Sequence, residues 1–294
     1  KGGCPLASGN MKDIKRRIKS VESTMQITKA MELVASSKLR KAKERADRAK
    51  PFFDTLYGTM CEIVDNTGTL SSAYMKKRDI NCVALIVIAG DRGLAGGFNS
   101  NNLKLAYARA KEIAAEGKTV KIVAIGKKSA EFFEKREFEV LKKYIDVAET
   151  MTIYTAMDIV SDLIMYYTDE ICDAVEIFYT SFLSTLTQEV KTLPLLPFEI
   201  KKNESGKPTV KTEYEPSPEA VFDRIVPEYL TGILYGAVVD SFAAEQAARR
   251  TAMESATDNA GDIIADLSLL YNRARQSSIT SEIIDIIGGA QAQS

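Results

Sequence analysis

The stretch VALIVIAGDRGLAGGFNSNN, residues 83–102, joins an apolar β-branched run, a glycine-rich turn and several asparagines. The apolar run predicts a buried strand, and the asparagines after the turn predict an asparagine-capped helix. Glycines at positions 90, 93, 96 and 97 resemble the start of many phosphate-binding loops. The first hypothesis that this stretch raises is therefore a nucleotide-binding enzyme.

Strands and helices alternate along the chain around this stretch. Their alternation from about residue 80 to 200 predicts a small α/β domain with a mostly parallel sheet. The polar segment 201–218, which contains Pro and Gly, predicts a surface loop or hairpin that closes the domain. The sequence predicts strands at residues 81–90, 119–126, 174–182 and 187–200, and helices at residues 99–117, 127–136 and 155–172.

The glycine-rich turn lacks the residues that would make it a nucleotide site. A P-loop needs Lys followed by Ser or Thr after its glycines, and no such pair follows Gly97. A dinucleotide fingerprint needs GxGxxG and an acidic residue after the next strand, where this chain has Lys127 and Lys128. Glycines also allow a helix to fold back tightly on a strand. We therefore favour a structural role over phosphate binding, and predict no bound cofactor or metal.

Two long helical segments flank the α/β domain. Residues 11–50 contain neither Gly nor Pro, and Pro51 predicts a kink or a restart of the first helix. The second segment has no proline after Pro227 and is rich in alanine. Because a compact domain cannot bury two helices of this length, we expect them to form an antiparallel coiled coil. The apolar stripe that we expect on the first helix consists of Ile14, Ile18, Val21, Met25, Ile27, Met31 and Val34.

The expected fold class is thus an α/β domain plus a long α-helical coiled coil. Residues 1–10, which are small and polar, are expected to be an expression scar or disordered. The remaining segments are an N-terminal coiled-coil helix at 11–75, a central α/β domain at 76–215 and a C-terminal coiled-coil helix at 216–294.

The composition excludes several classes of chemistry. The chain has no histidine, which rules out Ser–His and Cys–His nucleophile pairs and imidazole metal sites. Its four cysteines are far apart in the sequence, which favours reduced thiols over a disulfide framework or zinc site. No apolar run is long enough to span a bilayer.

Charge is distributed unevenly between the two helical segments. Residues 11–50 hold thirteen Lys and Arg against five Asp and Glu, whereas residues 250–294 hold three Arg against six acidic residues. These opposite charges favour pairing of the two helices, although screened surface pairs contribute little. The basic run KLRKAKER at 38–45 is compatible with a solvated face, with an acidic protein partner or, less well, with nucleic acid, because no aromatics interleave it.

Four motifs together resemble one known family. ITKAMELVASSKLRKAKERA (27–46), GDRGLAGGFNSN (90–101), EQAARRTAMESATDNAGDII (245–264) and LLYNRARQSSITSEIIDIIGGA (269–290) occur in order. The chain resembles the gamma subunit of the bacterial rotary ATP synthase from about Met11 to its end. The resemblance implies a Rossmann-like central domain that binds no nucleotide.

The resemblance also implies a function and partners. The coiled coil would rotate inside a ring of three alpha and three beta subunits, while the α/β domain would contact the epsilon subunit and the membrane rotor ring. Proton or sodium flow would thereby be coupled to ATP synthesis or hydrolysis, with catalysis on the beta subunits. The expected location is the cytoplasmic face of the bacterial cell membrane, without transmembrane segments.

Matching motifs also imply which side chains contact the catalytic ring. The tip IIDIIGGAQAQS at 283–294 would lie in an apolar sleeve. The implied partner-contact residues are Met31, Lys38, Arg40, Lys41, Gln246, Arg249, Gln276, Thr280 and Glu282.

Two other function classes make different predictions. A static coiled-coil scaffold with an α/β head would bind partners without activating them. A nucleotide hydrolase in its own right would bind and turn over ATP as an isolated chain. Activation of an inert ring of alpha and beta subunits separates the rotor from the static scaffold, and ATP turnover by the isolated chain separates it from the hydrolase.

Overall fold

The computed structural model describes residues 11–67, 70–76, 78–198 and 213–291. The predicted scar at 1–10 and most of the predicted loop at 201–218 lie outside these residues. The described chain forms two compact units. The first, which we call the coil unit, holds residues 11–34 and 250–291, and the second, the head unit, holds Ala35–Arg249. Helices α1 (Met11–Thr67) and α5 (Pro218–Gln291) contribute to both.

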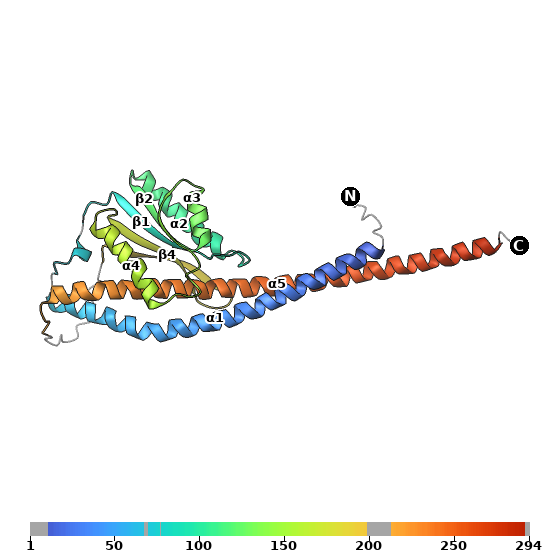
Figure 1. The fold of residues 1–294 in the computed structure, drawn as a ribbon, viewed down its shortest axis with the longest axis horizontal. Helices are drawn as coiled ribbons and strands as arrows, with labels where there is room; N and C mark the ends of the chain where they lie inside the picture. The colour runs from blue at the N-terminus through green and yellow to red at the C-terminus, as the bar shows by residue number, and fades with distance from the viewer. Residues whose placement is uncertain (1–10, 68–69, 77, 199–212, 292–294) are drawn as a thin grey trace. The chain divides into compact units, whose positions relative to one another are not determined.

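A five-stranded sheet in the order β3-β2-β1-β4-β5 forms the centre of the head unit (Figure 1). Its strands are β1 (Cys82–Ile88), β2 (Thr119–Ile125), β3 (Glu139–Tyr144), β4 (Ala174–Phe182) and β5 (Gln188–Leu196). Neighbouring strands are parallel except β4 and β5, which are antiparallel. The prediction of an α/β domain with a mostly parallel sheet is confirmed.

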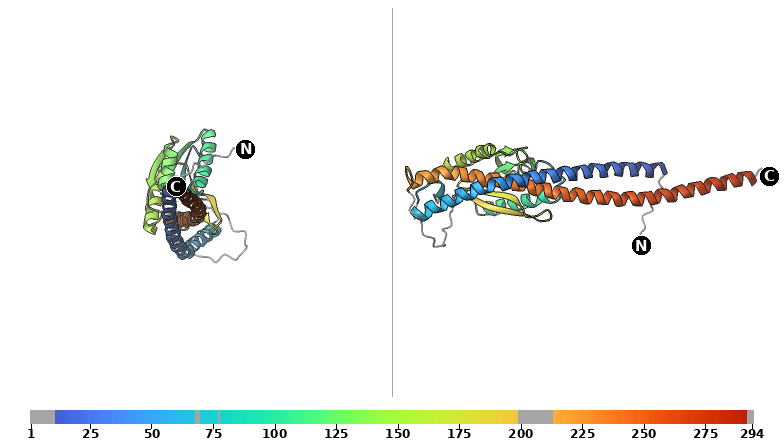
Figure 2. Two further views of the ribbon diagram at one scale, coloured as in Figure 1. Left: turned by 90° about the vertical axis from the view of Figure 1, so that its right-hand side faces the viewer. Right: turned by 90° about the horizontal axis from the view of Figure 1, so that it is seen from below.

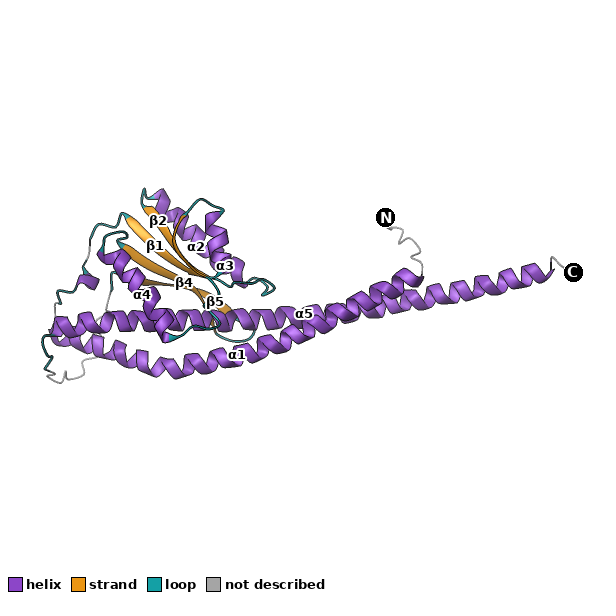
Figure 3. Cartoon of the chain, in the orientation of Figure 1, coloured by secondary structure: helices purple, strands orange, loops and turns teal. Residues whose placement is uncertain are grey.

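Helices cover both faces of the sheet (Figure 3). Successive residues of β1 point to opposite faces of the sheet. Leu85 and Val87 pack with α2 (Phe98–Ala115) and α3 (Lys127–Glu134) on one face. Ile86 and Ile88 point the other way, to α4 (Ile153–Thr168) and to the parts of α1 and α5 in this unit. A strand buried on both faces is apolar at every position, as the apolar run VALIVI at 83–88 indicates. The short 3₁₀ helix η1 (Ala73–Met75) precedes β1.

Strand β3 was not predicted. It is an edge strand with partly exposed residues, and its sequence EVLKKY carries three charges. Ion pairs join it to its neighbours, for example Lys121 to Glu139 at 3.4 Å between β2 and β3. Charged side chains protect an edge from pairing with other chains, but they also hide the alternation by which a strand is predicted.

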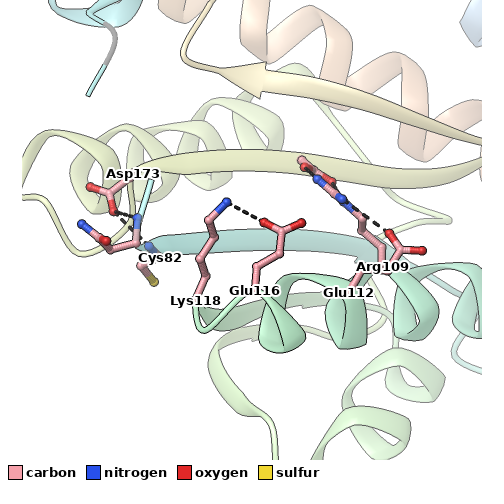
Figure 4. Close-up of polar contacts among 8 residues, drawn as sticks. Cys82, Arg109, Glu112, Glu116, Lys118 and Asp173 are labelled. Carbon is pink, nitrogen blue, oxygen red and sulfur yellow. Dashed lines mark hydrogen bonds and ion pairs between the residues drawn. The ribbon is translucent and has the colours of Figure 1, made fainter. Parts of the chain in front are cut away.

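Polar side chains fasten the amino ends of the central strands (Figure 4). Asp173, which precedes β4, accepts hydrogen bonds from the backbone N–H groups of Asn81 and Cys82, each at 2.9 Å. Arg109 of α2 binds both carboxylate oxygens of Glu176 on β4, at 2.8 and 3.1 Å. A bidentate pair of this kind is directional, so it orients α2 on the sheet.

In the coil unit, α1 and α5 lie side by side (Figure 2), and a heptad pattern marks the buried seam. The half-buried residues Ile14, Ile18, Val21 and Met25 belong to it, as predicted. The seam then continues through Thr28 and Glu32, each 9% exposed, whereas Ile27 and Val34 are 58% and 55% exposed. The prediction for Ile27 and Val34 was therefore wrong. The seam keeps alternate spacings of four and three residues. This spacing places Thr28 and Glu32 in the seam, although apolar residues such as Ile27 are next to them in the sequence.

Two threonines set the pairing of the helices in the coil unit. The hydroxyls of Thr28 and Thr257 are 2.7 Å apart across the seam. Counting antiparallel residues from this contact places Met11 opposite about residue 274, so the rest of α5 extends beyond the start of α1. Exposed isoleucines mark this extension, at positions 279, 283, 284, 286 and 287.

Pro51 lies inside a continuous helix. Helix α1 runs from Met11 to Thr67 without a restart, although an internal proline removes one backbone hydrogen bond. Residues around it pack against α5 in the head unit, where Tyr57 stacks on Tyr229 with ring centroids 5.5 Å apart. Tertiary packing of this kind stabilises a helix beyond what its propensities would allow.

We expect Gly126→Ala to destabilise the protein more than Gly117→Ala. Both glycines have positive φ, +91° and +78°, so alanine costs about 1 kcal/mol at either position. A Cβ at Gly126 would also lie 1.9 Å from the carbonyl oxygen of Ala89, while one at Gly117 meets nothing within 4 Å. The total cost at Gly126 should reach about 3 kcal/mol. Urea unfolding of the two variants measures the difference, and equal midpoints would contradict it.

Candidate functional site at the junction of the glycine-rich loop and helix α5

Asparagine side chains tie the glycine-rich loop to the ends of the central strands. Asn99 accepts a hydrogen bond from the Gly90 N–H at 2.8 Å and donates to the Arg92 carbonyl at 3.1 Å. Asn102, fully buried, donates to the carbonyls of Ile88 and Phe178 at 2.5 and 3.2 Å. The predicted asparagine cap was wrong, because Gly97 occupies the N-cap position of α2 without a side-chain bond. The asparagines bind the loop and strands instead.

Backbone conformation explains some of the glycines in the loop. Gly96 has φ of +54°, which glycine adopts without strain. Leu94 adopts φ of +62° and its side chain is 65% exposed. Gly90 serves a different purpose, since a Cβ there would lie 2.7 Å from a carboxylate oxygen of Glu245 on α5. The absence of a side chain at Gly90 thus allows α5 to approach the end of β1.

Side chains of α5 also cap the free end of β4. Strand β1 pairs with β4 only as far as Phe178, and β4 continues to Phe182. The Thr180 N–H donates to Ser241 Oγ at 2.9 Å, and the Phe182 N–H donates to Asp240 Oδ1 at 3.0 Å. Buried backbone N–H groups need acceptors. Helix α5 therefore supplies the bonds that a neighbouring strand would otherwise make.

An ion pair completes the junction. Arg249 donates to Glu245 one turn earlier on α5, and to the carbonyl of Gly93 in the loop at 3.2 Å. Burial raises the pKa of the Glu245 carboxyl, while the positive charge of Arg249 acts in the opposite direction. The loop, the end of β4 and one face of α5 are thereby joined by directional contacts.

This geometry supports a structural role for a loop that resembles phosphate-binding loops. In open α/β sheets, ligands bind outside the carboxyl ends of the strands. Here the Glu245 carboxylate lies against Gly90 at that edge, where its negative charge would repel a phosphate. The Lys127 N–H beside the loop is bound by Asp91 at 2.8 Å. The structural interpretation of the glycines accounts for these contacts.

Comparison with known proteins gives the family. A family model described as ATP synthase matches residues 10–293. The ATP synthase gamma chain of Ruminococcus albus is 56% identical over 94% of this chain and 96% of its own length. The sodium ion specific gamma chain of Acetobacterium woodii is 39% identical over 96% of this chain and 98% of its own length. This chain belongs to the ATP synthase gamma chain family.

A solved structure agrees with this fold of the gamma chain family. A chain from the Euglena gracilis mitochondrial ATP synthase, described with OSCP, F1 and c-ring in rotational state 3, has a TM-score of 0.69. The match covers 97% of this chain and 95% of that chain, at 18% identity. The predicted fold of a coiled coil with an α/β domain is confirmed.

The helices that the structure describes include none with the length and apolar character needed to span a bilayer. Among the same residues there is no group of three or more His, Cys, Asp or Glu side chains that could hold a metal ion.

The residues implied to contact partners fall into both units of this gamma chain family member. In the head unit, Arg40 and Lys41 are exposed, whereas Lys38 pairs with Glu149 at 2.7 Å. Gln246 is only 4% exposed and Arg249 is held by Glu245. In the coil unit Met31 is half-buried, and the exposed residues are Gln276, Thr280 and Glu282.

Four residues of the junction and its surroundings were missed by sequence reasoning. Asp240, Ser241 and Glu245, together with Gln246, interrupt the otherwise apolar and small stretch YGAVVDSFAAEQAA at 235–248. Polar residues on a buried helix face need partners, and this was the signal that could have indicated them. Glu149 gave no such signal, because it lies in an exposed loop and becomes important only through Lys38 and Arg45 of α1.

We expect Arg249→Ala to destabilise the gamma chain fold more at pH 7 than at pH 5. Without Arg249 the pKa of Glu245 in the folded state rises further, whereas its pKa in the unfolded state stays at about 4.3. The folded state then binds more protons than the unfolded state, so stability falls as pH rises from the unfolded pKa through the native pKa. At pH 7 the loss should be about 3 kcal/mol, typical of breaking a buried pair.

Urea unfolding across this pH range measures the effect. The double variant Glu245→Gln/Arg249→Ala removes the buried charge and should recover much of the stability and lose the pH dependence. The neighbouring, half-exposed Arg250→Ala serves as the control. A loss in Arg249→Ala that is independent of pH would contradict the assignment of Glu245 as its partner.

Proposed function

We propose that this chain is the rotating shaft of an ATP synthase. Its coiled coil would turn inside a ring of three alpha and three beta subunits, with the α/β domain against the epsilon subunit and the membrane rotor ring. The observation that carries the proposal is the 56% identity to an ATP synthase gamma chain over 94% of this chain. Catalysis would occur on the beta subunits, and this chain would couple it to proton or sodium flow.

The described surface suits a shaft that is enclosed by other subunits. Helix α5 exposes isoleucines at 283, 284, 286 and 287 beyond the start of α1. Contiguous apolar residues on a surface are typical of a binding interface. An apolar sleeve around this tip would make contacts without preferred direction, which allow rotation. The chain would be held peripherally at the cytoplasmic face of the bacterial cell membrane.

The contact residues that we propose follow the same arrangement. Arg40 and Lys41 of α1 are exposed and available to acidic loops of the ring, together with Lys38 and Met31 nearby in the sequence. Gln276, Thr280 and Glu282 would contact the ring nearer the tip. Gln246 and Arg249 would contact the ring further from the tip. Gln246, which is 4% exposed, would have to be uncovered for this contact, and Arg249 would have to exchange from Glu245 to a partner carboxylate.

Reconstitution tests the proposal. Alpha and beta subunits are purified from an organism that has a related gamma chain, such as Ruminococcus albus, and are combined either with this chain or without it. ATP hydrolysis and subunit stoichiometry are then measured. We expect a stable complex whose hydrolysis depends on this chain, because shaft orientation would bias each beta subunit between states. Assembly without activation would favour the static scaffold, and hydrolysis by this chain alone would favour an enzyme in its own right.

We expect the double variant Arg40→Ala/Lys41→Ala to reduce hydrolysis by the assembled complex about fivefold, the effect of roughly 1 kcal/mol in a barrier. Both residues are exposed, so the free energy of unfolding should change by no more than about 0.5 kcal/mol. The control is the double variant Lys104→Ala/Arg224→Ala, which also removes one Lys and one Arg, from exposed positions of α2 and α5. Equal hydrolysis rates in both double variants would contradict the proposed contact.

A further inference from the structure

Helix α5 makes two side-chain contacts at the end of β4 that lie next to each other in its sequence. Asp240 and Ser241 accept hydrogen bonds from the N–H groups of Phe182 and Thr180. We propose that these two residues are positioning residues, which set the rotational orientation of α5 on the α/β domain. Resting on the proposed function, we further infer that this attachment keeps the α/β domain and the shaft turning together.

The geometry of the two acceptors defines an angle. Adjacent residues on an α-helix point about 100° apart. Their donors are two residues apart on β4, on the side of the strand that β1 no longer covers. A rotation of α5 about its own axis would bring one acceptor closer and move the other off its donor. The pair therefore resists rotation in either direction.

Apolar packing supplies part of this resistance. The same segment of α5 packs into the core of the head unit through small and branched side chains such as Val238, Val239 and Ala243. The hydrophobic effect is itself non-directional, so this packing resists rotation only through the shapes of the side chains that interdigitate. Hydrogen bonds weaken steeply when their angle is lost. Asp240 and Ser241 add directional contacts to this apolar packing.

The two bonds differ in burial, since the bond from Phe182 to Asp240 is partly buried and the bond from Thr180 to Ser241 is buried. Ser241 is 1% exposed and Thr180 is 3% exposed, so their bond is shielded from solvent. One turn further along α5, Glu245 fills the space beside Gly90, and Arg249 reaches the Gly93 carbonyl. The residues of α5 that make polar contacts with the α/β domain thus lie between positions 240 and 249, all within the head unit.

The first experiment tests the bonds themselves in the full chain. Amide hydrogen exchange of Thr180 and Phe182 is measured in the wild type, Asp240→Ala, Ser241→Ala and Asp240→Asn. The asparagine variant keeps an acceptor oxygen without the charge, so Phe182 should stay protected in it. We expect exchange at Phe182 to rise by roughly fivefold in Asp240→Ala, and exchange at Thr180 to rise similarly in Ser241→Ala. Unchanged exchange in both alanine variants would overturn the proposal.

The second experiment tests the role in coupling. The complete ATP synthase is reconstituted into vesicles with each variant, and ATP-driven ion uptake is measured per ATP hydrolysed. Asp240→Ala/Ser241→Ala should lower this ratio by about twofold or more while hydrolysis continues. The reason is that a weaker attachment of α5 to β4 would allow the shaft to rotate relative to the α/β domain. Asp240→Asn, which keeps both acceptors, should keep the wild-type ratio, and subunit stoichiometry is checked in each vesicle preparation.

The outcomes separate this inference from the proposed function. A wild-type chain that fails to activate hydrolysis would overturn the proposed function and the coupling role with it. A wild-type chain that couples normally, with an unchanged ratio in Asp240→Ala/Ser241→Ala, would overturn the coupling role alone. If the double variant does not assemble, the single variants Asp240→Ala and Ser241→Ala are compared with Asp240→Asn in the same assay, and equal ratios again overturn it.

Discussion

Strand β4 extends beyond the last residue of β1 with which it pairs, and the backbone N–H groups at its end must find acceptors inside the protein. Much of the head unit follows from this constraint. Helix α5 has to lie close enough to place Asp240 and Ser241 at those donors. Its approach in turn brings Glu245 against the end of β1, where a Cβ at Gly90 would lie 2.7 Å from a carboxylate oxygen of Glu245. The glycine-rich loop and the polar residues of α5 are therefore two parts of one junction.

The junction also shows how a common α/β edge acquires a role inside a protein. The carboxyl ends of parallel strands, followed by a glycine-rich turn, commonly receive a ligand. In this member of the gamma chain family, a helix of the same chain occupies that edge with a carboxylate and an arginine. The buried acid is costly to ionise, and the arginine offsets this cost. The chemistry of the edge is thus used for internal attachment.

The coil unit depends on a different balance. Its seam includes small and polar residues, such as Thr28, Thr257 and Ala260, beside apolar ones, while other large apolar residues of α1 and α5 are exposed. A polar pair within a coiled-coil seam specifies pairing at some cost in stability. Exposed apolar residues such as Leu33 and Ile287 are consistent with a coil that other subunits surround. This arrangement supports the shaft that we propose.

The sequence by itself determined the long helices, most strands and the family, because each rests on local signals such as periodicity, glycine and proline placement, or linear motifs. Tertiary structure decided which residues form the seam, since Ile27 and Thr28 are adjacent and the antiparallel partner selects between them. It also decided that the charged segment 139–144 is an edge strand and that Asn99 and Asn102 bind strand ends instead of capping a helix. Asp240 and Ser241 illustrate the physical reason: their partners lie about sixty residues away along the chain, at 58 and 61 residues. Contacts of that kind depend on how the elements pack, and local sequence patterns do not contain this information.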